Sequence, residues 1–107
     1  MVVPYTDYTL TIILENADLS TAREIHVTIE QNGRDIDTTD VTATSDGQGG
    51  CTMTAAFTQV QTSRLRDNID AYVMVNWVNA QGVHPTPPAK QKINVGEQLL
   101  KRVLYAE

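Results

Sequence analysis

The residues that most often carry chemistry are sparse in this chain and widely spaced. His26 and His84 are the only histidines, and neither has a cysteine or a carboxylate at the spacing of a metal site. His26 alternates with apolar neighbours, so it should face solvent on a strand. We therefore expect a surface histidine rather than a metal ligand, and no metal or other cofactor.

An acidic cluster in the segment DIDTTD is the second candidate for chemistry. It contains Asp35, Asp37 and Asp40, and carboxylates are ligands that calcium prefers. The order of an EF-hand loop, with its glycine and final glutamate, is missing. We interpret the cluster as the solvated acidic face of a hairpin, with a bound calcium ion as the alternative.

Candidate nucleophiles have no activating partner in the sequence. Cys51 lacks an adjacent histidine or lysine, and its inward phase predicts a small core residue. Ser20, Ser45 and Ser63 have no GxSxG context. The glycine-rich run SDGQGG lies between two predicted strands, whereas a phosphate-binding loop opens a helix. These patterns predict a protein that is not an enzyme.

Aromatic residues suggest a binding surface as an alternative. A sugar-stacking platform could draw on Tyr5, Tyr8, Tyr72, Trp77 and Tyr105. Trp77 is in phase with Val73 and Val75, however, which favours a core tryptophan over a ligand platform.

Composition excludes several classes of protein. The chain has 107 residues and a formal net charge of −5, with no local stripe of lysine and arginine, so nucleic acid is not an expected partner. No apolar run approaches the roughly 20 residues of a membrane helix, and the N-terminus lacks the features of a secretory signal. A single cysteine excludes an internal disulfide, which favours synthesis in a reducing cytoplasm.

Alternation of apolar and polar residues predicts about seven short strands. Asn32-Gly33 is a strong signal for a two-residue hairpin turn. The expected strands are Tyr8–Glu15, Glu24–Gln31, Arg34–Asp37 with a continuation through Asp40–Thr44, Cys51–Phe57, Ile69–Val78 and a last stretch around Lys90–Val95.

The connection 58–68 breaks the alternation. Thr58 and Gln61 fit a capping box, so a short helix that crosses between two sheets is expected. Ile69–Val78 is apolar on both faces, which predicts a central strand. The prolines that follow cannot donate ladder hydrogen bonds, so they belong at an edge or a bulge.

These elements predict one all-β domain over residues 1–107, an antiparallel immunoglobulin-like β-sandwich with a helical crossover at 58–68 and a short C-terminal helix. The Cys…Trp…Cys framework of true immunoglobulin domains is absent. Segment 96–107 carries an apolar stripe too short for a stable lone helix, so it should dock on this domain or on a neighbour.

Two stretches are predicted protein–protein contacts in a homo-oligomer. One is the proline-rich edge and the other is the C-terminal stripe. Their residues are Val83, Pro85, Pro87, Pro88, Leu99, Leu100, Val103 and Leu104. The alternative is a monomer whose C-terminal helix caps one end of the sandwich.

Several phrases of the sequence resemble a known type of protein. They are TLTIILENADLS, IHVTIEQNG, FTQVQTSRL, IDAYVMVNWVNAQGV and INVGEQLL. They resemble a small β-sandwich encoded among the structural genes of tailed bacteriophages and prophages of gut Firmicutes. The chain is also loosely similar to the N-terminal domain of phage baseplate upper proteins. The resemblance runs from Tyr8 to Leu104, and the prolines after Val83 depart from it.

The resemblance implies a virion protein that is assembled in the bacterial host cytoplasm and contacts other virion proteins in the tail or baseplate. It implies no catalytic residues. Two alternatives stay open. One is a capsid decoration or head-fibre base protein, and the other is a carbohydrate-binding module that recognises a surface glycan.

Overall fold

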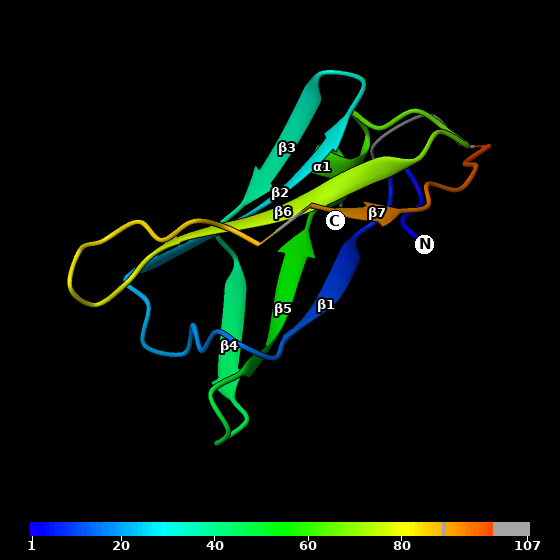
Figure 1. Cartoon of the computed structure of the whole chain (residues 1–107). Coiled ribbons are helices and arrows are strands. Elements are labelled where there is room, and N and C mark those ends of the chain that lie inside the picture. The colour runs from blue at the N-terminus through cyan, green and yellow to red at the C-terminus, as the bar shows by residue number, and fades with distance from the viewer. Residues whose placement is uncertain (89, 100–107) are drawn as a thin grey trace, which may run out of the picture.

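The computed structural model describes residues 1–88 and 90–99. Their strands form two antiparallel sheets that pack against each other (Figure 1). The elements are β1 (Tyr8–Leu14), β2 (Glu24–Gln31), β3 (Arg34–Thr38), β4 (Val41–Ser45), β5 (Cys51–Phe57), α1 (Gln59–Thr62), β6 (Ala71–Val78) and β7 (Gln91–Ile93). The small sheet has the order β1-β5-β4 and the large sheet has the order β3-β2-β6-β7. The predicted all-β sandwich is confirmed, whereas its immunoglobulin-like assignment stays a prediction.

The first hairpin of the large sheet follows directly from its turn residues. Asn32 and Gly33 have φ values of 51° and 79°, the left-handed conformation that a type I′ turn requires. This turn places Gln31 opposite Arg34 and Thr28 opposite Asp37. Because side chains alternate along a strand, Ile25, Val27 and Ile29 of β2 face the core together with Gln31, whereas the residues between them face outward.

The chain changes sheets between β3 and β4, so the predicted return strand is in fact two strands. Thr38 holds this corner. Its buried hydroxyl donates a hydrogen bond to the carbonyl of Ala56 over 2.8 Å and accepts one from the N–H of Asp40 over 3.1 Å. The side chain of Thr38 therefore bonds to a backbone group within the bend and also links the bend to β5.

The predicted helical crossover is confirmed but is only one turn long. Thr58 and Gln61 form the capping box. Thr62 is fully buried, and its hydroxyl donates to the carbonyl of Thr6 over 2.7 Å and accepts from the N–H of Thr6 over 3.1 Å. These bonds attach α1 to the segment that precedes β1.

β6 is central, as its two apolar faces predicted, with β2 on one side and β7 on the other. The core between the sheets contains Val2, Leu19, Val27, Ile29, Ile36, Cys51, Met53, Ala55, Phe57, Leu65, Ala71, Val73, Val75 and Val95. Cys51 and Phe57 are thus core residues, as predicted. Val2 was not predicted in the core, and it joins through a parallel bridge to Val95.

The proline-rich segment ends the regular ladder of β6. Residues 83–88 are not in a strand, and pairing resumes only at Gln91–Ile93. Residues 96–99 are neither helix nor strand. The rest of the predicted C-terminal helix, with Leu100, Val103 and Leu104, lies outside the described residues.

Gln31 is a buried polar residue at the end of β2, with 1% of its surface exposed. Its amide nitrogen donates to the carbonyls of Arg66 and Ile69, and its amide oxygen accepts from the N–H of Arg66. The side chain therefore satisfies three backbone groups of the loop between α1 and β6.

Replacing Gln31 should destabilise the domain strongly. In Gln31→Leu three backbone groups lose their partner. A fully buried unsatisfied group costs about 1–3 kcal/mol, but these three bonds are only part-buried, so water can replace some of what is lost and we expect a total of roughly 2–5 kcal/mol. Urea denaturation measures this change. The exposed loop variant Gln48→Leu is the control and should stay within about 0.5 kcal/mol of the wild type. Equal midpoints for the two variants would show that the Gln31 network contributes nothing.

Candidate interaction surfaces

The outer face of the large sheet carries a groove of about 360 Å³. Its lining comes from β2, β3, β6 and the segment before β7, and consists of Thr28, Glu30, Asp35, Tyr72, Met74, Asn76 and Lys90. The ammonium group of Lys90 lies 4.5 Å from the centroid of the Tyr72 ring. This cation–π contact covers one face of the aromatic ring and restricts stacking on it.

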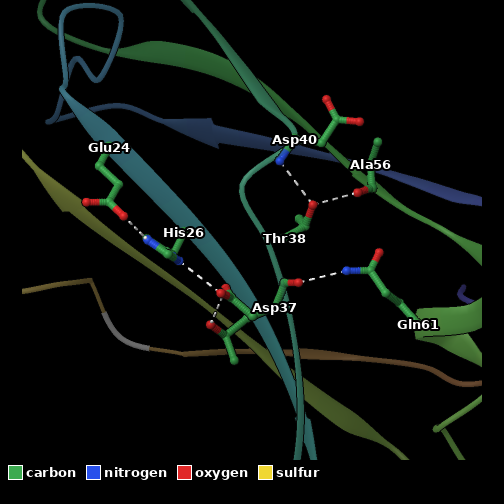
Figure 2. Close-up of polar contacts among 8 residues, drawn as sticks. Glu24, His26, Asp37, Thr38, Asp40, Ala56 and Gln61 are labelled. Atoms are coloured by element: carbon green, nitrogen blue, oxygen red, sulfur yellow. Dashed lines mark hydrogen bonds and ion pairs between the residues drawn. The ribbon is translucent and has the colours of Figure 1, made fainter.

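His26 lies on the same outer face, between two carboxylates (Figure 2). Its Nδ1 is 2.9 Å from a carboxylate oxygen of Asp37, and its Nε2 is 2.6 Å from a carboxylate oxygen of Glu24. Asp37 also accepts a hydrogen bond from the hydroxyl of Thr28. The predicted surface position of His26 is confirmed, but its two carboxylate neighbours were not predicted.

The sequence contained a signal for both neighbours. Glu24 is two residues before His26 and so shares its face of the strand. The two-residue turn places Asp37 opposite Thr28, which brings it diagonally across from His26. Spacing rules for metal sites compare residues within one segment, so they do not detect a neighbour such as Asp37 that lies on the adjacent strand.

The two carboxylates favour the charged form of the histidine. The hydrogen bond to Asp37 is the largest cause, and the one to Glu24 adds to it, so the pKa of His26 is raised above 6.5. A neutral imidazole carries one N–H and could donate to only one of the two. The protonated ring donates to both.

This arrangement does not support catalysis or metal binding. Both ring nitrogens already face a carboxylate, and the nearby hydroxyl of Thr28 donates to Asp37. The carboxylates lie against different nitrogens of one ring. Within the described part of the chain, no three His, Cys, Asp or Glu residues are arranged to hold a metal ion.

Asp37 also connects the outer face to the crossover. Its backbone carbonyl accepts a hydrogen bond from the amide of Gln61 over 2.8 Å, and Gln61 is the residue that completes the capping box of α1 (Figure 2). Asp35 and Asp37 both lie on the exposed outer face of β3, whereas Asp40 belongs to the corner that leads to β4.

A second groove, of about 460 Å³, lies where the end of β1 meets the proline-rich segment. We call it the lateral groove. It is lined by Ile13, Leu14, Glu15, Asn16, Ala17, Trp77, Thr86 and Pro88. Trp77 is half-buried and packs against the core, so it forms part of both the core and the groove wall.

Of the predicted contact residues that the structure describes, only Pro88 lines the lateral groove. Pro88 is exposed at the lateral groove, Pro85 and Pro87 are half-buried, and Val83 is 56% exposed. Leu99 is exposed at 88% but does not line the lateral groove. The contacts predicted for Leu100, Val103 and Leu104 lie outside the described residues.

The aromatic residues do not form one platform within residues 1–88 and 90–99. Tyr72 lines the groove on the outer face, Trp77 lines the lateral groove, and Tyr5 lines a third pocket beside Arg34 and Arg66. Tyr8 points inward from β1 and packs against the core. A sugar would therefore meet a single aromatic ring at each of these places.

Comparison of the chain with protein-family models, with curated proteins and with solved structures gave no match. In residues 1–88 and 90–99, no helical segment has the length and apolar character needed to cross a bilayer.

The His26 cluster predicts a specific dependence on pH. Because its folded-state pKa is raised, its stabilisation is fully present below pH 6.5 and is lost as the pH rises through the folded-state value. The cluster is exposed, so its contribution to the free energy of unfolding should be below about 1 kcal/mol. Titration of the His26 ring by NMR should give a midpoint above 6.5, and Asp37→Asn should lower it.

The control for this titration is Asp35→Asn, which removes a carboxylate of the same strand and face that does not bond to His26. It should lower the midpoint less than Asp37→Asn does. Equal effects of the two variants would mean that general charge, rather than the hydrogen bond to Asp37, raises the pKa.

Proposed function

We propose that this protein is a non-enzymatic structural component of a tailed bacteriophage virion, acting as an assembly module in the tail or baseplate through protein–protein contacts. The observation that carries the proposal is the lateral groove, where Trp77, Ile13 and Pro88 form an apolar opening at the side of the sandwich. Pro88 is among the contact residues expected from the sequence.

The proline-rich segment suits a contact surface. A chain of this composition favours extended conformations that are ordered before binding, so little conformational entropy is lost when a partner docks. Its start is held in place, because the N–H of Asn79 donates to the carbonyl of Val83 and the side chain of Asn79 accepts from the N–H of Val83. Val83 therefore projects from a fixed turn.

The charge distribution supports proteins as partners. The outer face of the large sheet presents Glu24, Glu30, Asp35 and Asp37, and the chain carries a net charge of −5. Such a surface repels phosphate backbones. In this proposal the chain is made in the host cytoplasm and works as a homo-oligomer among other virion proteins, with no role for a membrane.

A capsid decoration or head-fibre base protein would use the same surfaces with a different partner. A carbohydrate-binding module would have to recognise its glycan with single aromatic rings, and the ring of Tyr72 is partly covered by Lys90. For this reason we favour the assembly role over the glycan-binding role.

Incorporation into particles tests the proposal. Phage particles produced with this chain should contain it at a constant copy number by quantitative mass spectrometry, and immunogold labelling should place it at the tail. Val83→Asp puts a charge on the exposed contact segment and should reduce incorporation about tenfold, the effect of about 1.4 kcal/mol of lost affinity. Thermal unfolding of the purified variant should match the wild type.

The matched control is Val60→Asp, which places the same charge on another exposed valine, on α1 (47% exposed against 56% for Val83). It should leave incorporation unchanged. Label on the head would favour the decoration alternative. Particles without the chain, together with binding on a glycan array that Tyr72→Ala or Trp77→Ala abolishes, would replace the assembly role with glycan recognition.

A further inference from the structure

Four strand edges end the two sheets, and one of them differs from the others. An exposed edge presents unpaired N–H and C=O groups, and proteins usually protect it with charges, prolines or short length. β7 has three residues, follows the prolines and carries Lys92. β3 carries Asp35 and Asp37 on its outer face. β4 has five residues and lies between Asp40 and Asp46.

β1 is the least protected of the four edges. Acidic residues, Asp7 and Glu15, flank it as Asp40 and Asp46 flank β4, but the strand between them is two residues longer. Its seven residues, YTLTIIL, include no charge and no proline. It pairs with β5 without a bulge, from Tyr8 opposite Phe57 to Leu14 opposite Cys51. Among residues 1–88 and 90–99, nothing pairs with its other edge. β1 is therefore a regular strand that could accept a further strand.

The packing beside this edge is also incomplete. On β5 the inward residues Cys51, Met53 and Ala55 are buried. The inward residues of the neighbouring β1, by contrast, are only half-buried although they pack on the same core, namely Leu10, Ile12 and Leu14. On the outer face Ile13 is 70% exposed. A strand added at this edge would cover apolar surface on both faces.

We propose that β1 pairs antiparallel with β1 of a second copy of this chain, so that the two small sheets become one continuous six-stranded sheet. This inference rests on the proposed assembly function and specifies its first partner. It concerns a contact that uses the backbone of β1, and it reaches the lateral groove at Ile13 and Leu14, beside Thr86 and Pro88.

A second copy fits because β1 is its own complement. With Thr11 on the two-fold axis all seven residues pair, since Thr9 then faces Ile13 of the other copy and Leu10 faces Ile12. Inward residues meet inward apolar residues, and the exposed Ile13 is covered by a threonine. No charged side chain of the strand meets another, which matters for a chain with a net charge of −5.

The charges that flank β1 set a condition on this pairing. Asp7 and Glu15 would approach each other at both ends of the paired strands. Asp7 is already directed toward α1, where it accepts a hydrogen bond from the N–H of Gln59 over 2.9 Å. The remaining repulsion is exposed and screened by salt, so the dimer should become tighter as the ionic strength rises.

The small sheet supplies a closely matched control. Thr11 pairs with Thr54, and Thr54 pairs with Thr42 on β4. Thr11 and Thr42 are thus exposed residues of the same type, in the same row and on the same face, at opposite edges of one sheet. A substitution at either position should disturb the isolated domain to a similar extent.

The test measures self-association of the full chain by sedimentation velocity over a range of concentrations. The wild type should form a dimer. Thr11→Lys brings two lysines together at the two-fold axis and should weaken dimerisation at least about tenfold, whereas Thr42→Lys should not. Under mild oxidation Thr11→Cys should give a disulfide-linked dimer, because the two introduced cysteines meet at the two-fold axis, and Thr42→Cys should not. The native Cys51 does not interfere in either variant, because it is buried.

A wild type that stays monomeric would overturn the pairing, and slow hydrogen exchange along the outer edge of β1 in that monomer would show that its own chain covers the edge. Equal effects of Thr11→Lys and Thr42→Lys would also overturn it. The proposed function fails separately. If the chain enters phage particles but does not pair through β1, only the pairing is wrong, and if it pairs but never enters particles, only the virion role is wrong.

Discussion

The packing of the two sheets against each other is the constraint on which the rest of this structure depends. Val27 and Ile29 of β2 meet Met53 and Ala55 of β5 within one core, and all four are completely buried. Because side chains alternate along a strand, this packing directs every second residue outward. Which side chains appear on the two outer faces therefore follows from which residues are buried in the core.

The two outer faces differ strongly in character. The large sheet presents acidic side chains, His26, Lys90 and a groove, whereas the small sheet presents an uncharged row of threonines with Ile13 on its edge strand β1. The outer face of the large sheet is therefore rich in charged side chains, and the strands of the small sheet present none. The contacts that we propose, at β1 and at the lateral groove, lie away from the charged outer face of the large sheet.

Local patterns were sufficient for the strands and turns of this protein. Alternation predicted β1, β2, β5 and β6, and Asn32-Gly33 predicted the hairpin, because each of these depends on residues close in sequence. The predicted continuation of the return strand from Arg34–Asp37 through Asp40–Thr44 was wrong, because the chain bends after Thr38 and enters the other sheet. Thr38 bonds to Ala56 across the corner, and such a contact between distant residues leaves no periodic signal.

The candidate interaction surfaces were harder to predict from the sequence than the strands. The proline-rich segment was recognised as the end of the ladder, since a missing N–H is a property of the residue itself. The partners of His26 were missed because Asp37 comes from the neighbouring strand. Likewise, the strand pattern of YTLTIIL did not reveal that one edge of β1 has no strand beside it among residues 1–88 and 90–99, because only the order of strands in the sheet decides which edges are paired.

The sequence by itself determined the long strands, the Asn32-Gly33 hairpin, the inward face of each long strand and the uncharged character of β1. Those properties follow from residue type and spacing alone. Only the tertiary structure decided that β1 lies at an edge, that Gln31 and Thr38 are buried and satisfied, and that His26 lies between two carboxylates. The physical reason is that these contacts join residues far apart in the chain, and their proximity is set by how the two sheets pack.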